Sequence, residues 1–282
     1  MRRILLLSLL VLATNGLKAQ VHLRFTLRYV KTEIATPFRL VMVAPDGKVD
    51  TLANITMHSV SKSVRRDSKW ESHFPFVSKR YDRDLATVGD YRFLFTYDTS
   101  TLELPFSLDG TELYVDAGLY VTKIDDYYTV AYPELDIYRP APEEVKLYYL
   151  GVDTSSRLLF NLVNQSADTL FHGHRNDFHV YVQNYADGEK PDFCHSLSYS
   201  SRMNEPLVPG RSRRVREKDF TVTPGRCHAT LCYATDSQYT PRNNVTWSNQ
   251  GGFINPSLWQ PLSIQTWYVA TCNLFLTTLD LR

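Results

Sequence analysis

The sequence predicts an all-β protein built of two antiparallel β-sandwich domains in tandem. Three observations support this prediction. Apolar and polar residues alternate in many short stretches, turns rich in Gly, Pro and Asp separate these stretches, and the 18 Tyr and 14 Phe residues favour strands. No segment has the period of an amphipathic helix. At 282 residues, the chain is long enough for one large domain or two domains of ordinary size.

The chain begins with the pattern of a secretory signal peptide. Arg2 and Arg3 precede a short apolar run at residues 4–13, and Ala19 suits a cleavage site. A helix needs ~20 apolar residues to cross a bilayer, and neither this run nor any later one approaches that length. No cysteine precedes Cys194, so we expect no lipid anchor of the bacterial lipoprotein type. We therefore expect a cleaved signal peptide at 1–19 and a secreted or periplasmic protein with no membrane span.

Alternation is clearest in the first half of the remaining chain. The stretch VHLRFTLRYV (21–30) places every second residue, from Val21 to Tyr29, on an apolar face and the residues between them on a polar face. Further strands are expected on either side of two turns, Pro45-Asp46-Gly47 and Asp109-Gly110. The stretch from Met57 to Arg83 is less regular and more charged, which predicts a long loop or a short helix.

The stretch DIYRPAPEEVKLYYLG has the composition of a joint between domains. Pro140 and Pro142 stiffen the backbone, and the two glutamates after them favour solvent, as in a short semi-rigid linker. A boundary near residue 142 gives an N-terminal domain at 20–142 and a C-terminal domain at 143–282. The C-terminal half also alternates like strands, with Pro-Gly turns at Pro209 and Pro224.

Part of the C-terminal half resembles a known family. The stretches VNQS, DFHVYVQN followed by DG, PLVPG and TPGRCHATLCYA in residues 158–235 resemble an immunoglobulin-like domain of the bacterial proteinase-inhibitor type. The tryptophan that such domains often carry after the DG turn is absent, and EKPDF stands in its place. The N-terminal half is similar, in outline only, to the transthyretin-like sandwiches of exported bacterial proteins. These resemblances imply a fold more than a function.

All four cysteines lie in the C-terminal half, and in an exported protein an even number indicates disulfide bonds. If RCHATLCYA is one strand, Cys227 and Cys232 stand ~16 Å apart, too far to bond each other. We therefore expect Cys194 to bond one of these two and Cys272 the other, with free thiols as the alternative.

Three histidines fall within FHGHRNDFHVYVQN. On a strand, His172 and His174 share a face and could both reach one metal ion, whereas His179 has the opposite parity. A zinc site needs three or four ligands, and the glutamate that follows a His-x-His pair in cupins is missing here. We therefore interpret the pair as a polar strand face or turn and predict no metal and no cofactor.

Two surface features are candidates for binding. RSRRVREK is strongly basic and is expected to form an edge strand, where its charges either prevent sheet aggregation or bind an anionic partner. A long polar segment near the C-terminus carries two tryptophans suited to recognition. The candidate binding residues are Arg211, Arg213, Arg214, Arg216, Trp247 and Trp259.

Catalytic signatures are missing from the sequence: it has no nucleophile elbow, zinc-binding helix motif, phosphate-binding loop or dinucleotide fingerprint. The net charge of +1 argues against a nucleic-acid partner. We therefore expect a non-catalytic exported protein that binds another protein in envelope assembly or adhesion. The alternatives are a proteinase inhibitor or antagonist, and a carbohydrate-binding or metal-dependent protein.

Overall fold

The computed structural model describes residues 21–30, 36–57, 76–97, 100–125, 128–172, 178–184, 205–217, 222–236, 263–278 and 280. Every element within these ranges is a strand, so the prediction of an all-β protein is confirmed. The predicted signal peptide at 1–19 lies outside them. Within these ranges no helix has the length and apolar character needed to cross a membrane.

The chain divides into two compact units. Unit 1 comprises Met1–Ile137 and Gly252–Ile264, and unit 2 comprises Tyr138–Gly251 and Gln265–Arg282. The predicted domains, 20–142 and 143–282, differ from these units in two ways. The last residues of the strand that ends at Pro140 belong to unit 2, and unit 1 includes a segment from near the C-terminus.

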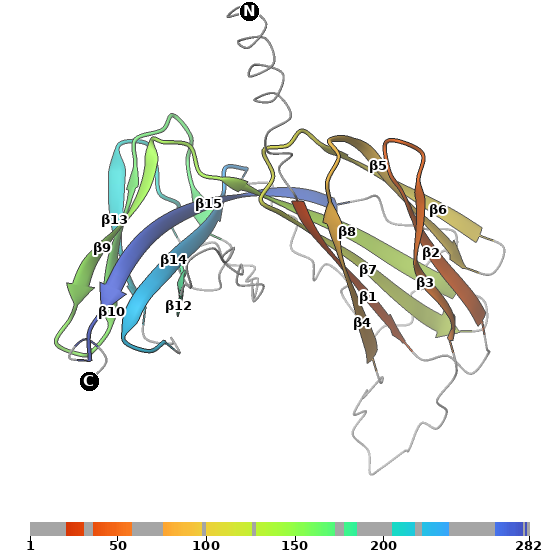
Figure 1. Ribbon diagram of the computed structural model, residues 1–282, viewed down its shortest axis with the longest axis horizontal. Helices are drawn as coiled ribbons and strands as arrows, with labels where there is room; N and C mark the ends of the chain where they lie inside the picture. Colours follow the sequence, from red (N-terminus) through yellow and green to blue (C-terminus); the bar gives the residue numbers. More distant parts are fainter. Residues whose placement is uncertain are drawn as a thin grey trace, which may run out of the picture. The chain divides into compact units, whose positions relative to one another are not determined.

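Unit 1 contains two sheets (Figure 1). One has the order β8-β7-β1-β4, in which β1 pairs antiparallel with β4 and parallel with β7. Its strands are β1 (Val21–Val30), β4 (Phe76–Leu85), β7 (Tyr114–Asp125) and β8 (Tyr128–Pro140). The other sheet has the order β3-β2-β5-β6, with strands β2 (Thr36–Val43), β3 (Val49–Met57), β5 (Gly89–Tyr97) and β6 (Ser100–Leu108).

The core of unit 1 follows from the alternation seen in the sequence. Val21, Leu23, Phe25 and Leu27 are all buried, as predicted for this face of β1. They share one hydrophobic cluster with apolar side chains of the second sheet, and the Phe25 and Phe93 ring centroids lie 5.2 Å apart. Burial of this apolar area is the main force that holds the two sheets of unit 1 together.

The predicted turn at Pro45-Asp46-Gly47 is present between β2 and β3. The Gly47 amide donates to the Ala44 carbonyl at 2.9 Å, and the Lys48 amide donates to the Asp46 carboxylate at 3.0 Å. The aspartate side chain thus takes the part of a backbone acceptor, which is why aspartate favours this position.

Strand β4 differs from the sequence prediction, which placed a loop or short helix between Met57 and Arg83. Residues Phe76–Leu85 form a strand along the whole of β1, from Val30↔Phe76 to Val21↔Leu85. The strand lies at the edge of its sheet, where charged residues are common. Charges on both of its faces hide the alternation that would have predicted it.

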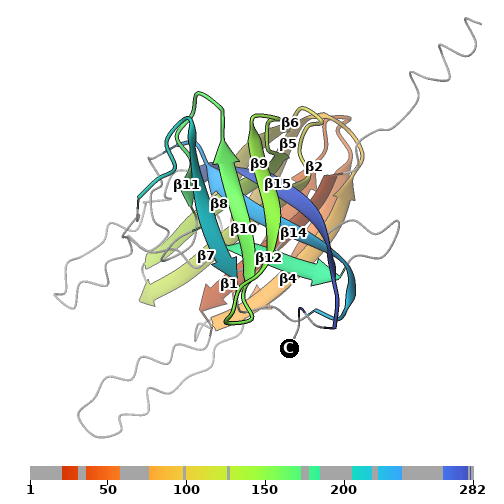
Figure 2. The ribbon, with the colours of Figure 1, turned by 90° about the vertical axis from the view of Figure 1, so that its left-hand side faces the viewer.

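Unit 2 also contains two groups of strands that share a core (Figure 2). A three-stranded sheet has the order β13-β10-β9, with β9 (Val145–Val152), β10 (Leu158–Asn164) and β13 (Arg211–Glu217). Behind it in Figure 2, β14 (Gly225–Ala234) pairs with β15 (Ser263–Leu276), β12 (Val180–Asn184) and β11 (Phe171–His172). The predicted edge position of the basic strand is confirmed, because β13 ends its sheet.

The proline stretch predicted as a linker is a short connection between strands. Pro140 is the last residue of β8, and Val145 is the first of β9. Within unit 2, the Ala141 amide donates to the Val269 carbonyl of β15 at 3.0 Å, and the Val145 amide donates to the Pro142 carbonyl at the same distance. These bonds anchor the connection to the fold of unit 2.

Asn164, at the end of β10, holds the turn that follows it. Its side chain is fully buried and makes four hydrogen bonds. The amide group donates to the carbonyls of Asp168 at 2.8 Å and Leu207 at 3.1 Å, and the side-chain oxygen accepts from the Ser166 amide and hydroxyl. A buried polar side chain that is fully satisfied in this way fixes the path of the loop.

The disulfide prediction is wrong for the described cysteines. Cys227, Cys232 and Cys272 are all free, and Cys194 lies outside the described residues. Cys227 and Cys232 do share one strand, β14, as predicted. In the pairing with β15, however, Cys227 lies opposite Leu274, Cys232 opposite Val269, and Cys272 opposite Ala229. No two cysteines therefore face each other across these strands, where a bond would form with the least distortion.

Candidate binding surface

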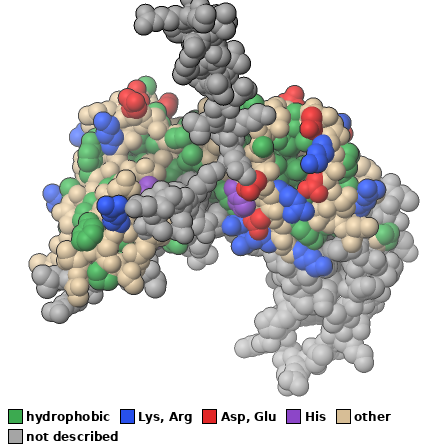
Figure 3. Space-filling model, viewed as in Figure 1, with side chains coloured by type: hydrophobic (Ala, Val, Ile, Leu, Met, Phe, Trp, Pro, Cys, Tyr) green, Lys and Arg blue, Asp and Glu red, His purple; other side chains and the backbone are tan. Residues whose placement is uncertain are grey.

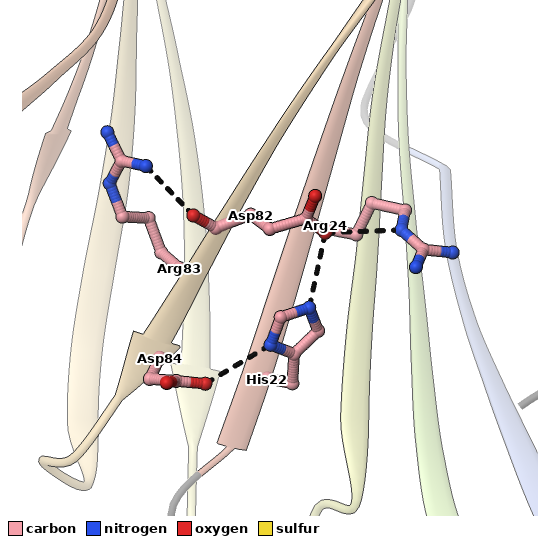
Figure 4. Close-up of polar contacts among 5 residues, drawn as sticks. All are labelled: His22, Arg24, Asp82, Arg83 and Asp84. Carbon is pink, nitrogen blue, oxygen red and sulfur yellow. Dashed lines mark hydrogen bonds and ion pairs between the residues drawn. The ribbon is translucent and has the colours of Figure 1, made fainter. Parts of the chain in front are cut away.

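A polar network covers part of the outer face of β1 and β4 in unit 1 (Figures 3 and 4). His22 lies between two carboxylates: its Nε2 is 3.2 Å from Asp82 Oδ1, and its Nδ1 is 3.1 Å from Asp84 Oδ1. The register explains this arrangement, because His22 lies opposite Asp84, and Arg24 lies opposite Asp82. Side chains that directly oppose each other across antiparallel strands are close enough to pair.

Arg24 extends the network toward β7. Its Nε lies 3.3 Å from the same Asp82 oxygen, and its guanidinium carbon lies 5.4 Å from the centre of the Tyr114 ring. Burial alone would raise the pKa of the Asp82 carboxyl, but hydrogen bonds from His22 and Arg24, together with their charges, lower it below its ordinary value. The Asp82 carboxylate is therefore held in its charged form.

Arg83 carries the network to the second sheet of unit 1. Its Nη1 donates to the Asp82 carbonyl at 2.8 Å (Figure 4). Its Nε donates to Asp50 Oδ2 of β3 at 2.7 Å. Arg83 thus links the Asp50 carboxylate to the backbone of Asp82, and each ring nitrogen of His22 has its own carboxylate. These contacts hold β1, β4 and β3 together, so we assign the network a structural role.

Of the histidine pair His172 and His174, the structure describes only His172. Within the described ranges no three His, Cys, Asp or Glu side chains gather as metal ligands would. The interpretation of His172 as solvent-facing is wrong: the residue is 7% exposed and meets the Phe178 ring edge-on. His172 lies opposite the buried Tyr233 in the β11–β14 pair, which explains its burial.

His179 is engaged in a separate contact. Its Nδ1 lies 2.6 Å from Glu217 Oε2, and the Glu217 side chain is only 5% exposed. A buried carboxylate needs such a partner, because desolvation without one is costly. This pair joins β13 to the segment that leads into β12.

Cys227 and Cys272 lack the lowered pKa of a nucleophilic thiol. Burial raises the pKa of both Cys227 and Cys272, although a hydrogen bond from the Tyr149 backbone lowers that of Cys272 in part. A reactive cysteine needs a lowered pKa, since the thiolate is the reactive form. The environment of these two cysteines therefore favours a packing role.

The outward-facing side chains of the three-stranded sheet in unit 2 form an exposed surface, here named the outer β10 face. In β10 the residues alternate between buried and half-buried, so every second side chain points away from the core. The registers bring Tyr148 of β9, Asn161 of β10 and Arg214 of β13 into one row. The whole face comprises Lys146, Tyr148, Leu150, Leu159, Asn161, Val163, Ser212, Arg214 and Arg216.

Apolar side chains gather on the β9 side of this face. Tyr148 is 46% exposed and Leu150 is 51% exposed. Leu150 stands at an irregularity in the register, because Tyr149 pairs with Phe160 and Gly151 with Leu159. A bulge of this kind leaves one residue unpaired and redirects its side chain.

Positive charge gathers on the β13 side. Arg214 and Arg216 are exposed and point outward from the sheet, and Arg216 Nε lies 4.0 Å from Asp153 Oδ2. The Asp153 carboxylate already accepts hydrogen bonds from the amides of Ser155 and Arg157, which lower its pKa. Arg214 has no acidic partner within the described part of the chain.

The other predicted binding residues do not belong to this face. Arg213 has the opposite parity, donates to the Glu205 carbonyl at 2.7 Å, and lies over the Phe178 ring. Arg211 is exposed at the start of β13 with the parity of Arg213. Trp247 and Trp259 lie outside the described residues. Of the four arginines, two therefore form the charged side of the outer β10 face.

No protein family, curated protein or solved structure matches this chain. The chemistry of the outer β10 face is therefore inferred from its own side chains. One signal for it exists in the sequence: VKLYYL places a lysine, a tyrosine and a leucine at the solvent-facing positions, where polar residues alone are usual. The face offers apolar contact along β9 and positive charge along β13.

Proposed function

We propose that this chain is an exported, non-catalytic protein that binds another protein through the outer β10 face. The observation that carries the proposal is the exposure of Tyr148 and Leu150 beside Arg214 and Arg216 on one sheet. Tyrosine and arginine are enriched where proteins bind one another, because each gives a large contact area together with a polar group. Exposed apolar side chains that lie side by side mark interaction surfaces more often than those scattered singly.

The proposal also includes export from the cytoplasm and a β-sandwich fold for each of the two domains. The basic and apolar residues at 1–19 have the pattern of a signal peptide, which supports a place outside the cytoplasm in envelope assembly or adhesion. Two sheets around one core in each unit support a tandem arrangement of β-sandwiches, and the resemblance of residues 158–235 supports the immunoglobulin-like type for the second. Sandwiches of this type commonly serve as binding modules.

Site-specific photocrosslinking in the cells that make the protein tests this function. A benzophenone amino acid replaces Tyr148 on the face, and in a control it replaces Val88, which is 56% exposed in unit 1. We expect a discrete adduct of higher mass from position 148 and none from position 88. No adduct from position 148, or the same adducts from both positions, would refute the proposal.

A further inference from the structure

The outer β10 face carries its exposed apolar side chains and its two arginines on different strands, and Lys146 lies on the same strand as the apolar side chains. Tyr148 and Leu150 belong to β9, whereas Arg214 and Arg216 belong to β13, with β10 between them. Neighbouring strands lie about 4.8 Å apart, so β9 and β13 are roughly 10 Å from each other. A single bound segment of polypeptide is wide enough to contact both strands at once.

The cations on this face are poorly neutralised by the protein itself. Lys146 and Arg214 have no acidic partner in the described ranges, and the acidic partner of Arg216, Asp153, lies 4.0 Å from its Nε. The Arg216 side chain remains 61% exposed. Three positive charges on one sheet face create a local potential that favours an anionic ligand.

Protection of the sheet edge explains only half of this pattern. Charged residues on an edge strand discourage pairing with other chains, and Arg214 and Arg216 would serve that purpose. The strand at the opposite edge, β9, instead exposes Tyr148 and Leu150, and exposed apolar side chains favour binding to another molecule. A phosphate group or sulfated glycan would use the arginines and leave the exposed leucine without a contact.

We propose that the partner of the outer β10 face is an acidic polypeptide segment that also carries apolar or aromatic side chains. Its carboxylates pair with Arg214 and Arg216, and its apolar side chains cover Tyr148 and Leu150. Arginine suits this role, since its planar guanidinium can accept a carboxylate with two hydrogen bonds. This inference rests on the proposed function and names the chemistry of the partner.

A synthetic copolymer of glutamate and tyrosine serves as the probe, and polyglutamate, heparin and phosphatidylglycerol vesicles serve as comparisons. Binding is measured by fluorescence anisotropy with the whole protein at low and high salt. We expect the copolymer to bind more tightly than polyglutamate, because only the copolymer supplies ring contacts. We also expect affinity to fall as salt rises, since exposed charge pairs are screened.

Two double variants probe the arginines and the apolar side chains separately. Arg214→Glu/Arg216→Glu should weaken copolymer binding at least tenfold, because each of the two substitutions exchanges an attraction for a repulsion. Tyr148→Ser/Leu150→Ser should weaken binding of the copolymer but leave binding of polyglutamate unchanged. Matched controls in unit 1 are Arg39→Glu/Lys79→Glu, with the same change in charge, and Val49→Ser/Val88→Ser, at similarly exposed positions. Circular dichroism confirms that each variant is folded.

The outcomes separate this inference from the proposed function. No copolymer binding, or equal losses in the face and control variants, overturns the acidic partner even if position 148 still crosslinks in cells. Tighter binding of heparin or vesicles than of the copolymer, unaffected by Tyr148→Ser/Leu150→Ser, also overturns it and assigns the face to phosphate or sulfate groups. Absence of both crosslinking and copolymer binding refutes the proposed function as well.

Discussion

Replacing Asn164 with alanine should destabilise unit 2 far more than the loss of one polar side chain usually does. The Asn164 side chain is fully buried, donates two hydrogen bonds and accepts two. Each such bond contributes about 1 kcal/mol net, and a buried partner left unsatisfied costs more. The Leu207 carbonyl keeps a second donor, the Leu170 amide at 2.9 Å, and the carbonyl of the exposed Asp168 can accept from water. We therefore expect a loss of about 3 kcal/mol in the free energy of unfolding.

Urea unfolding followed by circular dichroism measures this loss, and hydrogen exchange with mass spectrometry locates it. Asn161→Ala is the matched control: it removes the same residue type from the same strand, at a half-buried position on the outer β10 face. The control should change the free energy of unfolding by no more than ~0.5 kcal/mol. Faster exchange in Asn164→Ala should centre on β10 and on the bridge between Leu170 and Leu207. Equal effects of the two substitutions would refute the role assigned to Asn164.

Three further predictions concern unit 1. Gly89→Ala should cost about 1–3 kcal/mol in urea unfolding, because φ is +130° and an added Cβ would lie 2.9 Å from Pro45 Cβ; a neutral effect would contradict this backbone geometry. Folding lowers the pKa of Asp82, so its carboxylate adds stability at pH values above its ordinary pKa of 3.8. This stability is lost as the pH falls through the lower pKa of the folded state. Asp82→Asn should thus destabilise the protein at pH 7 but hardly at a pH below the folded-state pKa of Asp82, and an equal loss at both would count against it. A double-mutant cycle on Arg83→Met and Asp50→Asn should give a coupling energy of about 0.5 kcal/mol, since both side chains are more than one-third exposed. A coupling energy of zero would show that this ion pair does not stabilise the contact between the two sheets of unit 1.

The strands that sequence reasoning found are those whose pattern is local. β1 alternates without a break from Val21 to Tyr29, so its apolar face could be predicted from nine consecutive residues. β4 could not be recognised in this way, because Arg83 has the parity of the buried Leu85 but reaches Asp50 instead of the core. A charged side chain at such a position removes the periodic signal while the backbone pairing with β1 still holds the strand.

The side-chain contacts between neighbouring strands could not be predicted from the sequence, because they depend on the register of the strands. His22 and Asp84 are far apart in the chain, and only the register of β1 and β4 brings them together. The same limit explains why the disulfide prediction was wrong. The sequence does not show the register of β14 and β15, in which no cysteine lies opposite another. For the basic strand, alternation separates Arg213 from Arg214, but only the fold decides which of the two faces the core.

The central position of β1 has a consequence for how unit 1 folds. This strand comes first in the described chain, yet its two neighbours are β4 and β7, and it pairs in parallel with β7. During synthesis, β1 must therefore wait until most of unit 1 has emerged before both of its edges are covered. Contacts between residues so distant in sequence slow folding to the range of about milliseconds to seconds. Until β7 has paired, β1 keeps an apolar face and at least one edge open, so a chain of this topology has a period in which a chaperone can bind it.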